Sequence, residues 1–200
     1  MMTLLYKVHN NLYINLTNKC PCACTFCLRN TKDHMDDSGS LWLDEEPTAQ
    51  MIIDQLKEKD LTPYEEIVFC GFGEPTEKID VLLEVAKYIK EHTDKPLRIN
   101  TNGLGNLIHK KDITPSFKGL IDVISISLNT PNPQAYLDIV RPKFGEGSFE
   151  AMLEFAKNCT NSVPKVVLST VETTISKDEE QQCQKICDEL GVTYRIRPFE

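Results

Sequence analysis

Six apolar, strand-like runs separated by helical patterns extend along almost the whole chain. The runs lie at residues 12–16, 66–72, 96–101, 122–128, 165–172 and 193–198. Amphipathic segments separate them; in residues 76–92 the apolar face comprises Ile79, Leu82, Leu83, Ala86 and Ile89. The continuous β-branched character of the runs is typical of strands buried on both faces of a parallel sheet. The pattern predicts an α/β domain, built either as an open doubly wound sheet or as a partial barrel.

Length and charge restrict the class further. The 200 residues, 40% of them apolar, suffice for one well-filled domain, so we expect a single domain over residues 1–200. The first 18 residues lack the basic leader and cleavage site of a signal peptide. No apolar run approaches the roughly 18 residues of a membrane span, so we expect a cytoplasmic protein with no membrane partner. The net charge of −8 argues against direct nucleic-acid binding.

Four of the eight cysteines lie within eight residues, directly after the first strand-like run. In a reducing compartment such a group indicates metal or catalytic chemistry rather than disulfides. A structural zinc site normally joins two separated pairs of ligands, and no second pair lies nearby. A 4Fe–4S cluster is larger, and Cys20, Cys24 and Cys27 have the spacing Cys-x3-Cys-x2-Cys that lets one loop reach three of its corners. The fourth iron would then be open to a ligand other than the protein.

Cys22 is left over by this assignment. It is either a fourth ligand, which would make the chain an iron–sulfur electron carrier, or a spectator that points away from the cluster; we expect the spectator. The other cysteines are predicted to be structural. Cys183 and Cys187 share the buried face of a helix, Cys70 lies in a core strand and Cys159 lies near a helix end.

The cysteine spacing after the first strand of an α/β chain resembles the radical S-adenosylmethionine (radical SAM) superfamily. Three further segments resemble motifs of that family in the expected order: GFGEPT at 71–76, INTNG at 99–103 and SISLN at 125–129. The first departs from the family's Gly-Gly-Glu-Pro pattern by Phe72. The resemblance implies a partial (β/α)6 barrel of parallel strands. It also implies that a reduced 4Fe–4S cluster cleaves S-adenosylmethionine to a 5′-deoxyadenosyl radical, with electrons from an external donor such as flavodoxin or ferredoxin.

The resemblance also assigns residues to the cofactor. Phe26 matches an aromatic position near the adenine, and the 71–76 segment matches the part that binds the methionine ammonium. The complete set of residues expected to bind the cofactor is Phe26, Gly73, Glu74, Asn100, Asn102, Ser127, Asn129, Thr170 and Arg197. Arg195 shares a strand face with Arg197. If that face is inside, the two guanidiniums need anionic or carbonyl partners: the methionine carboxylate, the substrate or a structural carboxylate.

Residues 28–46 form the longest segment without regular pattern, beside the cysteines, and such loops are often functional. The residues expected to act on the substrate are Trp42, His34, Glu45, Arg195 and Glu200. Trp42 would serve as a lid or stacking surface.

No residue pattern names the substrate. The chain resembles a small stand-alone group associated with TatD-type nucleases, which includes queuine lyases. This resemblance implies cleavage of queuine to 7-aminomethyl-7-deazaguanine, a lyase reaction of queuosine salvage for tRNA modification. A flat deazaguanine would stack on Trp42, and Glu45, Glu46 or Glu200 would accept its ring protons. The alternatives are 7-carboxy-7-deazaguanine synthesis and activation of a glycyl-radical enzyme.

Overall fold

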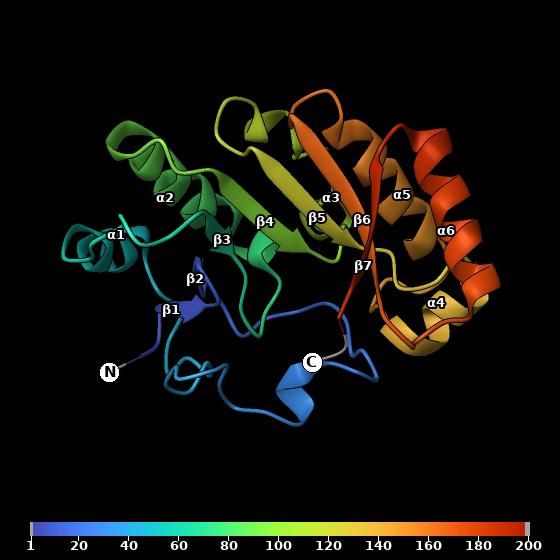
Figure 1. Ribbon diagram of the computed structural model, residues 1–200, viewed down its shortest axis with the longest axis horizontal. Helices are drawn as coiled ribbons and strands as arrows, with labels where there is room; N and C mark the ends of the chain where they lie inside the picture. Colours follow the sequence, from blue (N-terminus) through green and yellow to red (C-terminus); the bar gives the residue numbers. More distant parts are fainter. Residues whose placement is uncertain (1, 199–200) are drawn as a thin grey trace.

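The computed structural model describes residues 2–198 and contains one seven-stranded sheet with the strands in chain order (Figure 1). The strands are β1 (Leu5–Val8), β2 (Asn11–Ile14), β3 (Ile67–Phe69), β4 (Leu97–Thr101), β5 (Val123–Ser127), β6 (Lys165–Val171) and β7 (Thr193–Arg197). Strands β2 to β7 are mutually parallel and correspond to the six predicted runs. The sheet does not close on itself. The predicted α/β architecture of an open, partial barrel is confirmed.

Strand β1 was not predicted. It pairs antiparallel with β2, in a register that leaves only His9 and Asn10 in the turn. His9 adopts the left-handed region, at φ 51°, a position that hairpin turns usually give to glycine. The turn therefore lacks the usual sequence signal. The alternation of buried Tyr6 and Val8 with half-buried Leu5 and exposed Lys7 was the remaining indication of a strand.

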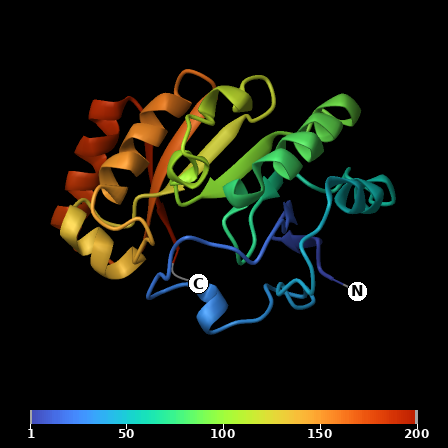
Figure 2. The ribbon, with the colours of Figure 1, turned by 180° about the vertical axis from the view of Figure 1, so that it is seen from behind.

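Helices cover one face of the sheet, the face turned toward the viewer in Figure 2. They are α1 (Ala49–Lys57), α2 (Ile79–His92), α3 (Gly105–His109), α4 (Pro133–Val140), α5 (Ser148–Cys159) and α6 (Lys177–Leu190). Short 3-10 turns η1 (Leu28–Asn30), η2 (Pro75–Lys78) and η3 (Thr114–Phe117) complete the connections. On α2 the predicted apolar face is confirmed except that Leu83 is half-buried and Val85 takes its place in the core. No helix among residues 2–198 is long and apolar enough to cross a membrane.

The two faces of the sheet differ in chemistry. On the helix side, residues such as Ile14, Phe69, Ile99 and Ile126 are fully buried in the main apolar core. The opposite face, turned toward the viewer in Figure 1, is called the open face below. On β4 and β7 the side chains that point to the open face are polar and half-buried or exposed. They alternate along each strand with side chains that point to the helix side. The expectation that all strands are buried on both faces is therefore wrong for this part of the sheet.

Candidate active site

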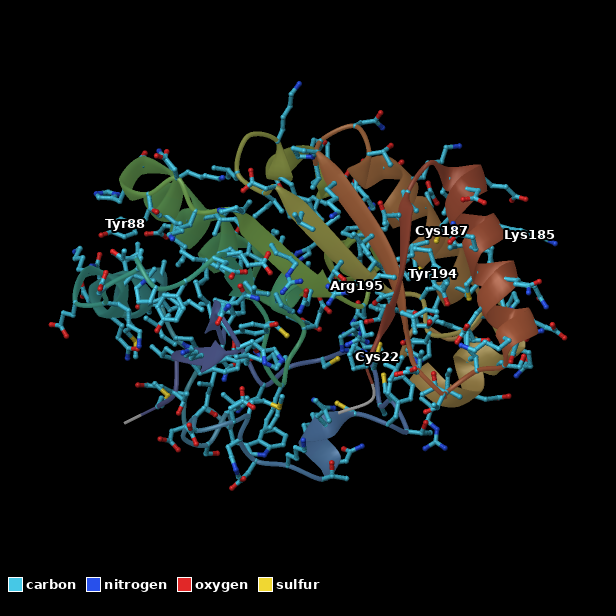
Figure 3. All side chains as sticks on the ribbon, viewed as in Figure 1. Cys22, Tyr88, Lys185, Cys187, Tyr194 and Arg195 are labelled. Atoms are coloured by element: carbon cyan, nitrogen blue, oxygen red, sulfur yellow. The ribbon has the colours of Figure 1, made fainter. Side chains whose placement is uncertain are left out.

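The loop that follows β2 places the cysteines at the carboxyl edge of the parallel strands, where Cys22 lies in Figure 3. Backbone hydrogen bonds fix it to the end of α4: Ala23 N donates to Val140 O at 3.1 Å and Thr25 N donates to Ile139 O at 2.9 Å. The Arg29 guanidinium also donates to the Cys22 carbonyl at 3.3 Å. The loop is thus fixed to α4 at Ala23 and Thr25, and Arg29 links its end back to Cys22.

The four thiols differ in exposure and position. Cys20, Cys24 and Cys27 are half-buried, whereas Cys22 is only 4% exposed. The Cys22 thiol hydrogen-bonds to those of both Cys20 and Cys24, which raises the pKa of Cys22 and lowers the pKa of its two neighbours. Cys22 therefore lies next to the other thiols, and its role as a spectator that points away from the cluster stays a prediction. Burial raises the pKa of Cys27.

Glu74 joins the loop after β3 to the end of β4. Its carboxylate is 3% exposed and accepts hydrogen bonds from Thr101 Oγ1 at 2.6 Å, from Thr76 Oγ1 at 2.7 Å and from Asn102 N at 2.8 Å. Burial raises the pKa of this carboxyl group, while these hydrogen bonds oppose the shift. Because both carboxylate oxygens are bound by the protein, Glu74 orients Asn102. Its predicted contact with the methionine ammonium stays a prediction.

The glycines of the GFGEPT segment allow this loop to pack on the chain leading to the cysteines. A Cβ atom on Gly73 would collide with the carbonyl oxygen of Thr17 and lie 2.7 Å from that of Lys19. The next residue, Glu74, donates its N–H to the same Lys19 oxygen at 2.8 Å. The close backbone approach that Gly73 allows is therefore made to another part of the protein itself. The GFGEPT and INTNG segments thus pack against the chain that leads to the cysteines and help to fix its position.

Two of the amides predicted to bind the cofactor have buried oxygen atoms without a partner. Among residues 2–198, Oδ1 of Asn100 on β4 and Oδ1 of Asn129 after β5 accept no hydrogen bond. Asn129 has a φ of 66°, a left-handed conformation that asparagine adopts more readily than most residues. A buried carbonyl without a donor is costly, so such atoms are commonly completed by a ligand or water. Both residues were predicted to bind the cofactor.

The other predicted cofactor residues are distributed over both faces. Ser127 ends β5 on the open face, level with Ser169, and Phe26 is 37% exposed on the cysteine loop. Asn102 points its amide toward Cys22 Sγ at 3.6 Å. Thr170, however, lies on the helix side, where its hydroxyl bonds to Tyr194 at 2.7 Å. Because neighbouring strand residues face opposite sides, Ser169 rather than Thr170 faces the open side.

Three arginines extend over the open face, and Figure 3 shows Arg195 there while Tyr194 lies on the α6 side of β7. Arg195 lines a cavity of about 360 Å³ together with Arg98 of β4. Arg197, two residues nearer the cysteine end, lies close enough to Cys70 to act on its pKa, although burial raises that pKa overall. Sequence reasoning missed Arg98, although period-two alternation places it on the same face as Asn100.

The predicted substrate residues lie apart. Trp42 is 42% exposed and meets Phe72 of the GFGEPT segment edge-on, with ring centroids 5.1 Å apart. His34 is exposed beside Asp33, and Glu45 is exposed on the same long segment. Glu46 instead accepts a hydrogen bond from the Thr17 hydroxyl and forms an ion pair with Lys78. Glu200 lies outside the described residues.

Tyr136 was also missed by the sequence analysis. It is fully buried on α4, and its hydroxyl has no hydrogen-bond partner among residues 2–198. Burial is the main cause that raises its pKa, and the nearby Cys22 and Cys24 contribute. A buried tyrosine has no sequence signal that distinguishes it from an ordinary core aromatic.

The donor set fits an iron–sulfur cluster with a bound small molecule. Thiolates are the usual protein ligands of such clusters, and three half-buried thiols stand on one loop. The unpartnered amide oxygens of Asn100 and Asn129 offer acceptors to a ligand with N–H or O–H groups. Within residues 2–198, no set of three or more His, Cys, Asp or Glu side chains is arranged to hold a single metal ion.

An open, mostly parallel sheet with a thiol-bearing loop over its carboxyl edge defines the structural class of this protein: an α/β scaffold with a cysteine-rich loop. Residues 14–195 match the family model of the radical SAM superfamily. The chain belongs to this superfamily, whose members are enzymes that use a 4Fe–4S cluster and S-adenosylmethionine. Because the members of this superfamily are enzymes, the match favours an enzyme over the electron-carrier alternative.

Two curated relatives are named as nucleotide enzymes. The chain is 28% identical over 193 residues to a probable GTP 3′,8-cyclase of Methanocaldococcus jannaschii. The aligned residues cover 94% of this chain and 58% of the relative. The chain is 26% identical over 182 residues to an S-adenosylmethionine-dependent nucleotide dehydratase of Selenomonas ruminantium, covering 88% and 60%. The chain thus spans about 60% of the length of these relatives.

Solved structures share the fold. Streptococcus suis SuiB bound to the precursor peptide SuiA has a TM-score of 0.69 at 19% identity, covering 98% of this chain and 40% of SuiB. TYW1 with a lysine–pyruvate adduct has a TM-score of 0.64 at 13% identity, covering 96% and 65%. At these identities the likeness shows the fold alone.

Proposed function

We propose that Cys20, Cys24 and Cys27 hold the cluster, that S-adenosylmethionine binds next to it against Asn100 and Asn129, and that the substrate is a small nucleotide-like molecule on the open face. The observation that carries this proposal is the grouping of three half-buried thiols with two buried, unpartnered amide oxygens at one edge of the sheet. When bound, the two cofactors supply a 5′-deoxyadenosyl radical that abstracts hydrogen from the substrate.

The residues of this chain bind and orient. Glu74 accepts the Asn102 N–H and two threonine hydroxyls, which fixes the end of β4 relative to the cysteine loop. Asn100 and Asn129 offer oxygen atoms that accept from ligand N–H or O–H groups. Cys22 is not a ligand in this proposal, because it is buried and its backbone is tied to Pro142.

The cluster assignment predicts large losses on single substitutions. Replacing Cys20, Cys24 or Cys27 with alanine should abolish the iron–sulfur absorbance after anaerobic reconstitution, because each would remove one of only three ligands. Cys22→Ala is the matched control, since it removes a thiol from the same loop, and it should retain the cluster. A Cys22→Ala protein without a cluster, or a Cys27→Ala protein with a normal one, would contradict the assignment.

The nucleotide class comes from the two curated relatives, which are named as a GTP cyclase and a nucleotide dehydratase. The exposed Trp42, supported edge-on by Phe72, offers a surface on which a base can stack. Incubation of the reconstituted enzyme with S-adenosylmethionine, dithionite and GTP, followed by mass spectrometry, tests this class. We expect 5′-deoxyadenosine and a GTP-derived product; 5′-deoxyadenosine with unchanged GTP would refute GTP as substrate.

Queuine is the second candidate, since its flat deazaguanine ring would use the same surface at Trp42. Queuine should be run in the same assay, where release of 7-aminomethyl-7-deazaguanine would identify the lyase. Formation of 7-carboxy-7-deazaguanine from a tetrahydropterin, or glycyl-radical formation on a partner enzyme, would identify the remaining alternatives. Queuine and a nucleotide differ in one property that the structure addresses directly: queuine carries no phosphate.

A further inference from the structure

The cavity on the open face is lined by cations in a protein that is acidic overall. Arg98, Arg195 and Lys165 face it, and Glu66 is its one acidic side chain among the described residues. The cavity therefore carries a net positive charge, although the whole chain has a formal charge of −8. Ser125 and Thr193 add hydroxyl groups to the same wall. This local reversal of charge distinguishes the cavity from an ordinary solvated surface.

Arg98 is only partly neutralised within the protein. Its side chain is 11% exposed, and one terminal nitrogen contacts Glu66 at 2.9 Å and donates to the Tyr13 hydroxyl at 3.3 Å. Its Nε is buried and has no hydrogen-bond partner among residues 2–198. A guanidinium stays charged at any physiological pH, so its unbound N–H groups need an acceptor. One edge of Arg98 is therefore fixed while another lacks a partner.

Arg195 faces the same cavity from the other side. No hydrogen bond or ion pair within residues 2–198 holds its guanidinium. The cavity is also lined by Val123, Lys165 and Thr193, the first residues of β5, β6 and β7, so it lies toward the amino ends of the strands and away from the cysteine end. Along β4, the four residues from Arg98 to Asn102 span about 13 Å. A molecule with its reactive part near Asn102 and a charged tail at the arginines fits this arrangement.

We infer that Arg98 and Arg195 form an anion-binding subsite that takes the phosphate tail of the substrate. This inference rests on the proposed function and narrows its substrate to a phosphorylated nucleotide. The planar fork of arginine donates two parallel hydrogen bonds to phosphate oxygens, and queuine has no phosphate to accept them. Glu66 and Tyr13 keep Arg98 in place on the wall of the cavity that Arg195 also lines.

The test is anaerobic calorimetry on the reconstituted protein with S-adenosylmethionine bound, using GTP, guanosine and tripolyphosphate as probes. GTP should bind at least about tenfold more tightly than guanosine, tripolyphosphate should compete with GTP, and GTP affinity should fall as NaCl rises. Arg195→Gln should weaken GTP about tenfold without changing guanosine binding, and Arg195→Lys should restore only part of it, since lysine lacks the fork.

Lys185→Gln is the matched control. It removes one positive charge from the exposed surface of α6, away from the open face (Figure 3), and should leave both affinities unchanged. Equal binding of GTP and guanosine, or equal losses in Arg195→Gln and Lys185→Gln, would overturn the subsite. Circular dichroism confirms that each variant is folded.

The wild-type protein is assayed in parallel for 5′-deoxyadenosine. If 5′-deoxyadenosine forms while GTP shows no advantage over guanosine, the subsite is wrong and the proposed chemistry stands. If no cluster assembles, the proposed chemistry fails, and the GTP preference is then scored on the protein without a cluster.

Discussion

The open face of the sheet has two halves, which differ in how far other side chains of the protein cover them. Over β1 and β2, side chains from the long segment and the GFGEPT loop close the face with an apolar cluster of Tyr6, Val8, Leu41 and Phe72. Over β4 to β7, the face keeps arginines and serines around a cavity of about 360 Å³. Buried amide oxygens without partners occur in both halves, at Asn11 and Asn15 in the first and at Asn100 and Asn129 in the second. The second half differs because its cations line an open cavity, whereas apolar side chains cover the first, and a cavity lined by cations is what a bound ligand requires.

The half over β1 and β2 should contribute more to the stability of the fold. The largest effect of a substitution on the free energy of unfolding is therefore expected there. Leu41→Ala should lower the free energy of unfolding by about 3 kcal/mol, because Leu41 is fully buried and the alanine leaves a cavity. Arg195→Gln in the other half should change it by no more than about 0.5 kcal/mol. Urea denaturation of the two variants measures the contrast. Equal losses would show that the arginine half is also a stability element and would break the comparison.

Glu74 connects the two halves through its hydrogen bonds. Its substitution should lower the free energy of unfolding by less than that of Leu41. Glu74→Gln should lower the free energy of unfolding by about 2 kcal/mol, because the amide nitrogen of glutamine would face donors that now meet a carboxylate oxygen. The variant should also bind the cluster less well, since Asn102 and the cysteine loop lose their orientation. Glu45→Gln, on an exposed carboxylate, is the control. A Glu74→Gln protein as stable as this control would show that the hydrogen bonds at Glu74 do not set the geometry.

Sequence patterns predicted β2 to β7 because each run is apolar and long enough to be recognised without partners. They did not predict β1, whose turn at His9 lacks glycine, or the way the long segment covers Tyr6 and Val8, because no periodicity relates that segment to a strand. The motifs located the cysteines and Glu74. They did not indicate that Glu74 accepts from Thr101, 27 residues away, since hydrogen-bond partners follow from the folded chain and not from spacing.

Strand parity explains why Arg98 was missed and why Thr170 lies away from the open face. Alternation tells which residues share a face but not which face the helices cover, and Ser169 and Thr170 are both small hydroxyl residues. The structure assigns Thr170 to the helix side and Ser169 to the open face. Arg98 was predictable by the same rule from Asn100, and a charged residue in the middle of an apolar strand was the available signal.

The smallest expected changes in stability are those that distinguish the open face of the sheet from its helix side. Asn129→Gly should change the free energy of unfolding by less than about 1 kcal/mol, because glycine accepts the φ of 66° and the lost amide oxygen has no partner in the protein. Thr170→Val should cost about 1 kcal/mol, since it breaks the hydrogen bond to Tyr194. For binding of S-adenosylmethionine to the reconstituted protein the order should reverse: about tenfold weaker in Asn129→Gly and unchanged in Thr170→Val. Thermal shifts with and without S-adenosylmethionine measure both quantities in one experiment. If Thr170→Val lost the ligand-induced stabilisation while Asn129→Gly kept it, the assignment of the cofactor to the open face would be wrong.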